Sequence, residues 1–203
     1  MYREEYPRPS FVRKEWTCLN GIWDFEFDDK NTGMSSKWYR PEHKLSEKIN
    51  VPFLFQSKLS NINKTDFHDF IWYKRTFKIE KSWHNKNILL HFGAVDYRCF
   101  IFINGELAGS HEGGHTSFHF DITDYLTWDE EEITLYVEDP SADETIPRGK
   151  QYWLEKSESI WYTRSSGIWQ SVWLEPINRT HMEEFICTTF FDSGSVKFEI
   201  TIK

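Results

Sequence analysis

The 203 residues predict an all-β protein, with one sandwich of two facing sheets followed by the first strands of a second sandwich. Three observations favour this fold class. Apolar and polar residues alternate with a period of two in many short segments, and no stretch keeps a helical period. Turn residues separate most of these segments at the spacing typical of a sandwich. Aromatic residues make up 18% of the chain, and aromatic side chains favour half-buried strands.

The individual strands follow from this alternation. Ile22–Asp28 alternates apolar and acidic residues, which places the two kinds on opposite faces of a sheet. Asn104 and Gly105 lie between two apolar runs and predict a type I′ hairpin turn, because both central residues of that turn need positive φ. Leu45–Ile49 and Asp124–Trp128 are expected to form at most single helical turns. The full set of expected strands is 22–28, 71–79, 88–92, 97–103, 106–109, 116–121, 132–137, 171–174, 184–190 and 195–202.

Two breaks in the pattern divide the chain. Residues 139–159 combine Asp-Pro, Ile-Pro-Arg-Gly and several acids without any period, and loops of this length are usually functional or mobile. Pro176 marks the second break, beyond which residues 181–203 predict one hairpin with its turn at 192–194. A lone hairpin is marginally stable in water. We therefore expect one domain over residues 1–178 and the truncated start of a second sandwich over residues 179–203.

Charge and cysteine content exclude several classes of partner and compartment. The net charge of −8 and the pI of about 5.5 argue against nucleic acid, because phosphate binding needs a basic surface. Cys18, Cys99 and Cys187 are odd in number and lack C-x-x-C spacing, which favours free thiols in a reducing compartment. Residues 1–7 carry no apolar signal segment, and no run approaches 18 apolar residues. We expect a cytoplasmic protein without a membrane partner.

One string resembles a metal site. His111-Glu112-Gly113-Gly114-His115 matches H-E-x-x-H, which zinc proteases carry on a helix so that both histidines share a face. Each of the two central glycines would cost a helix about 1 kcal/mol. The segment also follows a hairpin and precedes a strand. It therefore predicts a β-turn, and we expect no metal. The sequence contains no glycine-rich phosphate loop, and no cofactor is expected.

The order of the motifs resembles the N-terminal, sugar-binding domain of family 2 glycoside hydrolases of the β-galactosidase and β-glucuronidase kind. The motifs that carry the resemblance are Leu19–Phe25, Val51–Phe53, Trp72–Phe77, His91–Tyr97, Asn104-Gly105, His111–Gly114, Phe120–Thr123 and Ser166–Glu175.

The resemblance implies a jelly-roll (galactose-binding-like) sandwich that an immunoglobulin-like domain follows. A (β/α)₈ barrel comes next in the family and holds the two catalytic glutamates. On this basis residues 179–203 begin the immunoglobulin-like domain, and this chain contains no catalytic residue. Its expected partners are its own barrel and immunoglobulin-like domains, a carbohydrate in the full-length enzyme, and a possible second copy in a homo-oligomer.

Five residues are candidates for the rim of the sugar site: Arg148, Lys150, Gln151, Trp161 and Arg164. Pro and Gly give their loop a fixed irregular path, and each guanidinium offers a planar fork of donors suited to vicinal hydroxyls or a carboxylate. Members of the family often carry an aspartate, which contacts the substrate hydroxyls, at the position of Trp161. The tryptophan suits stacking on a sugar or packing against the barrel. The nearby acids, by contrast, are expected to form a solvated acidic loop, and they are Asp139, Asp143, Glu144, Glu155 and Glu158.

Three functions remain open on these residues. The chain is expected to be an accessory domain that shapes or supports the sugar site of a glycosidase, inactive by itself. An autonomous carbohydrate-binding module would need an exposed row or groove of aromatic rings. A pure scaffold would serve only packing between domains or oligomer formation, and the fold alone cannot separate it from the first function.

Overall fold

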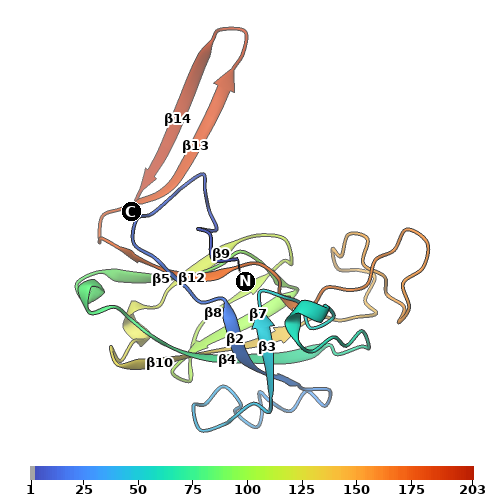
Figure 1. The fold of residues 1–203 in the computed structure, drawn as a ribbon. Coiled ribbons are helices and arrows are strands. Elements are labelled where there is room, and N and C mark those ends of the chain that lie inside the picture. The colour runs from blue at the N-terminus through green and yellow to red at the C-terminus, as the bar shows by residue number, and fades with distance from the viewer. Residues whose placement is uncertain (1–2) are drawn as a thin grey trace.

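The computed structural model describes residues 3–203, so the first two residues of the expected 1–178 domain lie outside the described residues. Two antiparallel sheets pack face to face, and a separate hairpin stands off from them (Figure 1). The six-stranded sheet has the order β3 (Glu47–Val51), β2 (Gly21–Phe27), β4 (Phe70–Lys78), β10 (Glu130–Glu138), β7 (Arg98–Ile103), β8 (Glu106–Glu112). The four-stranded sheet has the order β1 (Thr17–Cys18), β12 (Val172–Ile177), β5 (Asn87–Phe92), β9 (Phe118–Asp121).

The remaining elements are two further strand pairs and three short helical turns. β6 (Val95–Asp96) pairs with β11 (Gly167–Ile168), and β13 (Met182–Phe190) pairs with β14 (Ser195–Ile202) to form the separate hairpin. The 3-10 turns are η1 (Lys58–Ser60), η2 (Lys81–Trp83) and η3 (Thr123–Tyr125). Within residues 3–203, no helix has the length and apolar character needed to cross a membrane. The predicted all-β sandwich is confirmed.

Most of the predicted strands are present, and one prediction is wrong. Leu45–Ile49 is not a helical turn, because Glu47–Val51 forms strand β3 at the edge of the six-stranded sheet. Ile49 and Val51 both point into the core, and β2 supplies the backbone partners that the local sequence could not reveal. The predicted hairpin turn is confirmed, since φ is 52° at Asn104 and 81° at Gly105.

The alternation of the sequence sets which side chains enter the core. In β2, Trp23 is 1% exposed and Phe25 is 0% exposed, whereas Ile22, directly before Trp23, is 59% exposed. Successive residues of a strand face opposite sides, so position and not hydrophobicity decides the burial of Ile22. The main core lies between the two sheets and continues through β4, β5, β7, β10 and β12.

The outer face of the six-stranded sheet is also covered. The segment that joins β2 to β3 runs beneath this sheet in Figure 1 and packs on a second apolar cluster that includes Trp72, Phe102 and Tyr136. Lys74 is buried in the same layer. Its ammonium group lies 3.1 Å from Glu132 and donates to two backbone carbonyls of the covering segment, at 2.8 and 2.9 Å. The covering segment is thus held by packing and by a buried cation.

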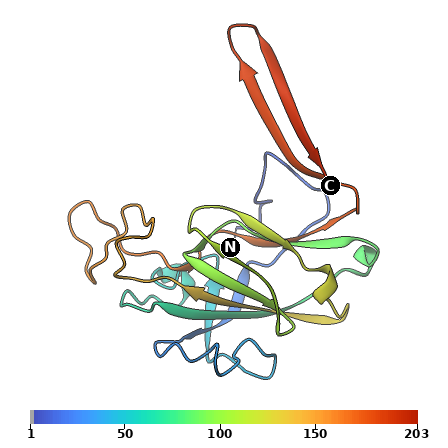
Figure 2. The same ribbon diagram turned by 180° about the vertical axis from the view of Figure 1, so that it is seen from behind.

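The hairpin of β13 and β14 extends away from the sandwich (Figures 1 and 2). Arg13 donates from its guanidinium group to the carbonyl of Met182, at 2.8 Å, and so ties the base of the hairpin to the N-terminal segment. Phe191 at the tip is 97% exposed. The other apolar side chains of the hairpin that are mostly or partly exposed are Phe185, Ile186, Phe190, Val196, Phe198, Ile200 and Ile202. Two strands alone therefore leave both faces of this hairpin in water.

Candidate functional site

The loop between β10 and β11, residues 139–166, contains all five candidate residues. It projects from one end of the sandwich, apart from the hairpin, and is drawn in orange in Figures 1 and 2. Its two arms are joined by backbone hydrogen bonds from Tyr152 to the carbonyl of Tyr162, at 2.9 Å, and from Tyr162 to the carbonyl of Lys150, at 2.8 Å. The loop is therefore an ordered projection of irregular backbone.

Arg148 folds the first arm of this β10–β11 loop on itself. Its guanidinium group donates to the carbonyls of Pro140 and Ser141, each at 2.9 Å, and to the carbonyl of Asp143. Its Nε is buried without a hydrogen-bond partner. The terminal nitrogens of Arg148 thus hold the loop backbone, and the planar fork is already engaged before any ligand arrives.

Arg164 joins the second arm to the sandwich. It is 4% exposed, and it donates to the carbonyls of Thr65, at 2.8 Å, and Leu154, at 3.2 Å. Its guanidinium carbon lies 3.8 Å from the ring centre of Phe67, a cation–π contact. Burial lowers the pKa of Arg164, although nearby carboxylates favour its charged form. Sequence reasoning offered this guanidinium as a surface fork, and the structure places it inside the base of the loop.

Aromatic rings gather on the outer part of the loop. Trp161 stacks on Tyr152, with ring centres 6.0 Å apart, and meets Trp153 edge-on, at 4.9 Å. A hollow of about 250 Å³ lies beside the two tryptophans. It is lined by Glu144, Ile146, Arg148, Gly149, Trp153 and Trp161. Lys150 is exposed next to it. The structure therefore brings Arg148 and Trp161 to one hollow, and Arg164 lies elsewhere.

Exposed apolar side chains surround this aromatic group. Leu154 is 53% exposed, Ile160 is 61% exposed and Tyr162 is 64% exposed, all on the same projecting loop. Large apolar groups that face water together are typical of interaction surfaces. The loop thus presents both a small hollow and an apolar rim.

Gln151 connects the middle of the loop to its roots. It donates from Nε2 to Asp96 of β6, at 2.7 Å, and accepts at Oε1 from the amide of Ser165, at 2.8 Å. Asp139 at the start of the loop accepts a hydrogen bond from the hydroxyl of Ser166 at its end. Asp139 is only 7% exposed, so the expectation of a solvated acidic loop is wrong for this residue.

Burial changes the ionisation of these two carboxyl groups. It raises the pKa of Asp96 to about 6, against the lowering effect of the Gln151 amide. Burial, together with the negative charge of Asp96, raises the pKa of Asp139 to about 7. Two carboxyl groups that titrate near neutral pH therefore lie where the loop joins the sandwich. Sequence analysis placed Asp139 in a solvated acidic loop and used Asp96 only as part of the His91–Tyr97 motif, because burial of a carboxyl group leaves no local sequence signal.

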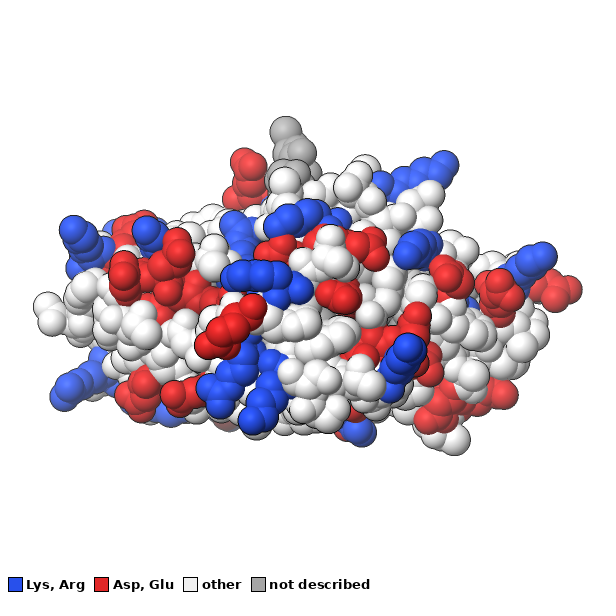
Figure 3. Space-filling model, turned by 90° about the horizontal axis from the view of Figure 1, so that it is seen from below, with Lys and Arg blue, Asp and Glu red and all other residues white. Residues whose placement is uncertain are grey.

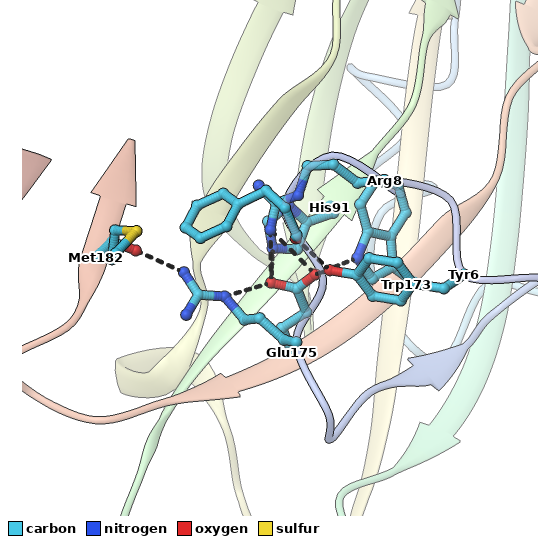
Figure 4. Close-up of polar contacts among 8 residues, drawn as sticks. Tyr6, Arg8, His91, Trp173, Glu175 and Met182 are labelled. Atoms are coloured by element: carbon cyan, nitrogen blue, oxygen red, sulfur yellow. Dashed lines mark hydrogen bonds and ion pairs between the residues drawn. The ribbon is translucent and has the colours of Figure 1, made fainter. Parts of the chain in front are cut away.

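A second polar cluster, also missed from the sequence, lies on the outer face of the four-stranded sheet (Figure 4). Glu175 of β12 is fully buried there. Its carboxylate lies 3.0 Å from Arg8 and 2.8 Å from Arg13, both from the N-terminal segment. The indole of Trp173 donates to it at 2.8 Å, and the hydroxyl of Tyr6 donates as well. The N-terminal segment, residues 3–16, thus covers this face as a strap.

The same carboxylate also meets His91 of β5. The Nε2 atom of His91 lies 3.2 Å from Glu175, and the imidazole stacks on Trp173 with ring centres 4.8 Å apart. Burial by itself would raise the pKa of Glu175, but the donors from His91, Tyr6 and Trp173 outweigh it and hold that pKa at about 2. Glu175 is therefore ionised at neutral pH and serves as the anchor of the strap.

A larger cavity of about 500 Å³ lies between the strap and the sheet. Among the residues that line it are Arg3, His91, His115, Trp169 and Gln170. The Trp169 indole donates to the carbonyl of Gly114, at 2.7 Å, and this fixes the ring at the cavity wall. The cavity is mixed in polarity, which is typical of small-molecule sites and of gaps between packed segments alike.

The H-E-x-x-H string forms a turn, as predicted. His111 and Glu112 end β8, and Gly113 has a φ of 126°. The Nε2 atom of His111 lies 3.2 Å from the carbonyl of Gly113 and 3.1 Å from the hydroxyl of Thr116. His115 instead meets Trp169 edge-on. Among residues 3–203, no group of three or more His, Cys, Asp or Glu side chains is arranged to hold a metal ion.

Charged side chains are mixed on the face shown in Figure 3. Acidic and basic groups alternate across it, and no broad basic surface is visible there. A nucleic-acid interface would instead need clustered Lys and Arg. The view agrees with the net charge of −8.

Comparisons with known proteins give the same family along most of the chain. The β-galactosidase of Thermoanaerobacter pseudethanolicus is 27% identical over 168 residues, which are 82% of this chain and 20% of that protein. The β-glucuronidase of Paenibacillus borealis is 27% identical over 146 residues, which are 71% of this chain and 24% of that protein. The chain thus spans about a fifth to a quarter of the length of these two relatives.

Solved structures show the same fold. The β-glucuronidase of Ruminococcus gnavus matches all of this chain and 35% of its own, with a TM-score of 0.76 and 21% identity. A β-glucuronidase of an uncultured Clostridium sp. matches 95% of this chain and 35% of its own, with a TM-score of 0.75 and 22% identity. Residues 16–176 match the family described as glycosyl hydrolases family 2, sugar binding domain. The chain therefore belongs to glycoside hydrolase family 2, and this part of it is the sugar-binding domain.

Proposed function

We propose that this chain is the non-catalytic N-terminal domain of a family 2 glycosidase that hydrolyses the O-glycosyl bonds of β-galactosides or β-glucuronides. The family match over residues 16–176 is the observation that carries this proposal. Retaining hydrolysis needs two carboxyl groups about 5–5.5 Å apart on either side of the scissile bond. We assign that pair to a catalytic barrel elsewhere in the enzyme, because the chain matches only a fifth to a quarter of its relatives.

The β10–β11 loop is our candidate for the contact with the sugar site. It projects from the sandwich and carries aromatic rings beside a hollow of about 250 Å³. Trp161 supplies a flat face for stacking on a sugar ring. Lys150 adds a charged group, whereas the amide of Gln151 is already bonded to Asp96 and Ser165. Arg148 and Arg164 hold the loop in shape through its carbonyls. Its exposed apolar residues form the rim that packs on the barrel.

The hairpin over residues 182–202 is our candidate for the start of an immunoglobulin-like domain, with the boundary near residue 178. Its exposed apolar side chains on both faces support this assignment, because two strands need further strands to bury them. We further propose that the enzyme is cytoplasmic and forms homo-oligomers. The three free thiols, Cys18, Cys99 and Cys187, support the reducing compartment.

Substitution of Trp161 in the full-length enzyme tests the role of the loop. Trp161→Ala is expected to lower kcat/KM for a nitrophenyl β-galactoside or β-glucuronide by about tenfold, the loss of about 1.4 kcal/mol of transition-state binding. Trp128→Ala is the matched control. Trp128 is a half-buried tryptophan whose ring lies 4.7 Å from that of His84, and it comes just before the start of β10, at the end of that strand away from the loop. An unchanged kcat/KM with a lowered Tm in Trp161→Ala would leave the loop only a scaffold role.

An autonomous binding module is the second candidate function, and the cavity of about 500 Å³ under the strap favours it. Titration calorimetry of the isolated chain with galactose, glucuronate and short oligosaccharides separates the two functions. We expect no heat of binding for the monosaccharides, since most of their contacts would come from the barrel. Millimolar or tighter binding would instead favour the module.

A further inference from the structure

Two buried carboxyl groups meet at the roots of the β10–β11 loop. Asp96 of β6 stands opposite Gly167 of β11 in the ladder of these two strands. Asp139 follows directly after β10, and it accepts a hydrogen bond from the hydroxyl of Ser166, the residue before Gly167. Both carboxyl groups therefore lie against the two residues at which the loop rejoins the sandwich.

The loop itself reaches back to this pair through Gln151. Its amide nitrogen donates to Asp96, at 2.7 Å, and its amide oxygen accepts from the backbone of Ser165, at 2.8 Å. The opposite side of Asp96 is closed by Gly114, where an added Cβ would lie 2.1 Å from the carboxyl oxygen. The position of the loop thus depends directly on the carboxyl group of Asp96.

The cations near this pair offset it only in part: Arg148 lowers the pKa of both carboxyl groups, but burial outweighs this effect. The nearby cations are Arg148 and Arg164. Their guanidinium groups donate to backbone carbonyls, Arg148 to that of Pro140 and Arg164 to that of Thr65. Asp69 adds another negative charge near Asp139. Within residues 3–203, neither Asp96 nor Asp139 forms an ion pair within 4.0 Å. Two buried negative charges without a paired cation repel each other, and one retained proton relieves that repulsion.

We propose that Asp96, Asp139 and Gln151 are positioning residues that latch the β10–β11 loop, and that the latch loosens when the carboxyl pair loses its proton. The folded-state pKa values of both groups are raised, so the stabilisation is present at acidic pH and is lost as the pH rises through about 6 to 7. Control of the sugar site by this latch rests on the proposed function. The latch itself is a property of the chain alone.

Hydrogen exchange of the isolated 203-residue chain tests the latch without any sugar. The reporters are the amides of Tyr152, Tyr162 and Ser165, all of which are hydrogen-bonded within the loop. Their protection, corrected for intrinsic exchange rates, is expected to fall about tenfold between pH 5.5 and pH 8. A factor of about ten in the opening equilibrium corresponds to a difference of one pKa unit between the latched and the open loop. Protection of the β4 and β10 amides in the core serves as the internal reference.

Three variants separate the latch from ordinary structural support. Asp139→Asn imitates the protonated carboxyl group, so the loop amides are expected to stay protected at pH 8. Gln151→Ala is expected to lose protection at every pH. Asp143→Asn is the matched control in the same loop. Within residues 3–203 the carboxyl group of Asp143 accepts hydrogen bonds only from Thr145, and its pKa is lowered, not raised.

The outcome for Asp139→Asn decides the proposal. A pH profile that matches the unsubstituted chain would overturn it, and Asp96→Asn provides the same test if Asp139→Asn does not fold. Loss of the pH dependence in either Asn variant, with retention in Asp143→Asn, would support the latch. This result is independent of the sugar site, because the proposed function is tested on kcat/KM of the full-length enzyme.

Discussion

Replacement of Glu175 by Gln is expected to destabilise the sandwich by about 3 kcal/mol. The pKa of Glu175 is about 2, against an ordinary value of 4.5. Each pKa unit corresponds to about 1.4 kcal/mol, so the ionised carboxylate stabilises the fold by about 3 kcal/mol. A neutral amide would leave the guanidinium groups of Arg8 and Arg13 without their counter-charge. Removal of one partner from a buried pair costs about 3–5 kcal/mol in other proteins, which agrees with this value.

Urea unfolding at pH 7, followed by tryptophan fluorescence, measures this loss, and thermal unfolding should show a Tm lower by about 6–12 °C. Glu112→Gln is the matched control. Glu112 pairs with Arg98 at 2.8 Å, but its side chain is 51% exposed, so its loss should cost under about 1 kcal/mol.

The pH dependence of the same variant gives a second test. The folded-state pKa of Glu175 is lowered, so its stabilisation is fully present above pH 4.5 and is lost as the pH falls towards 2. The difference in unfolding free energy between the unsubstituted chain and Glu175→Gln should therefore shrink below pH 4.5. A variant within 1 kcal/mol of the unsubstituted chain at pH 7 would refute the reasoning, as would a difference that persists unchanged to pH 3.

Lys74→Met and Gly114→Ala test two other buried contacts, and Gly149→Ala is an exposed control. Lys74→Met should lower the free energy of unfolding in urea by about 3–5 kcal/mol, because Glu132, 3.1 Å from the ammonium group, is left as a buried charge without its partner. The double variant Lys74→Met with Glu132→Gln should recover part of that loss. Gly114→Ala should cost about 1–3 kcal/mol, because the new Cβ would lie 2.1 Å from the Asp96 carboxyl oxygen. Gly149→Ala meets no atom within 4 Å and has a φ of 60°, so its cost should be limited to about 1–2 kcal/mol of backbone strain.

The local pattern of the sequence was enough to predict the sandwich. Strands such as β2 and β10 have clear periodicity, and the turn at Asn104-Gly105 needs only two neighbouring residues to specify it. β3 was missed because five residues, Glu47–Val51, carry little pattern and depend on β2 for their hydrogen bonds. Prediction was thus reliable where the information is local and failed where a distant partner supplies it.

The loop that contains the candidate residues was predictable from the sequence, but its internal contacts were not. The long unpatterned stretch marked the loop correctly, but the engagement of Arg148 and Arg164 with backbone carbonyls depends on how the loop folds. Glu175 was missed for a related reason. In the pattern of β12 it occupies a position that faces away from the core, and the strap that buries it comes from about 160 residues earlier in the chain. A glutamate at an outward-facing strand position gives the same alternating sequence pattern whether a distant segment covers it or water does.

The two buried ion pairs lie in the sandwich and not in the β10–β11 loop. Each sheet has a second covering on its outer face, held in one case by Glu175 and in the other by Lys74. Much of each sheet is therefore covered on both sides, and substitutions at the covered positions disturb packing or leave a buried charge. The β10–β11 loop is held to this rigid platform at its roots, while Trp161 and its neighbours meet solvent. A substitution at Trp161 can thus alter the loop surface without altering the sandwich that carries it.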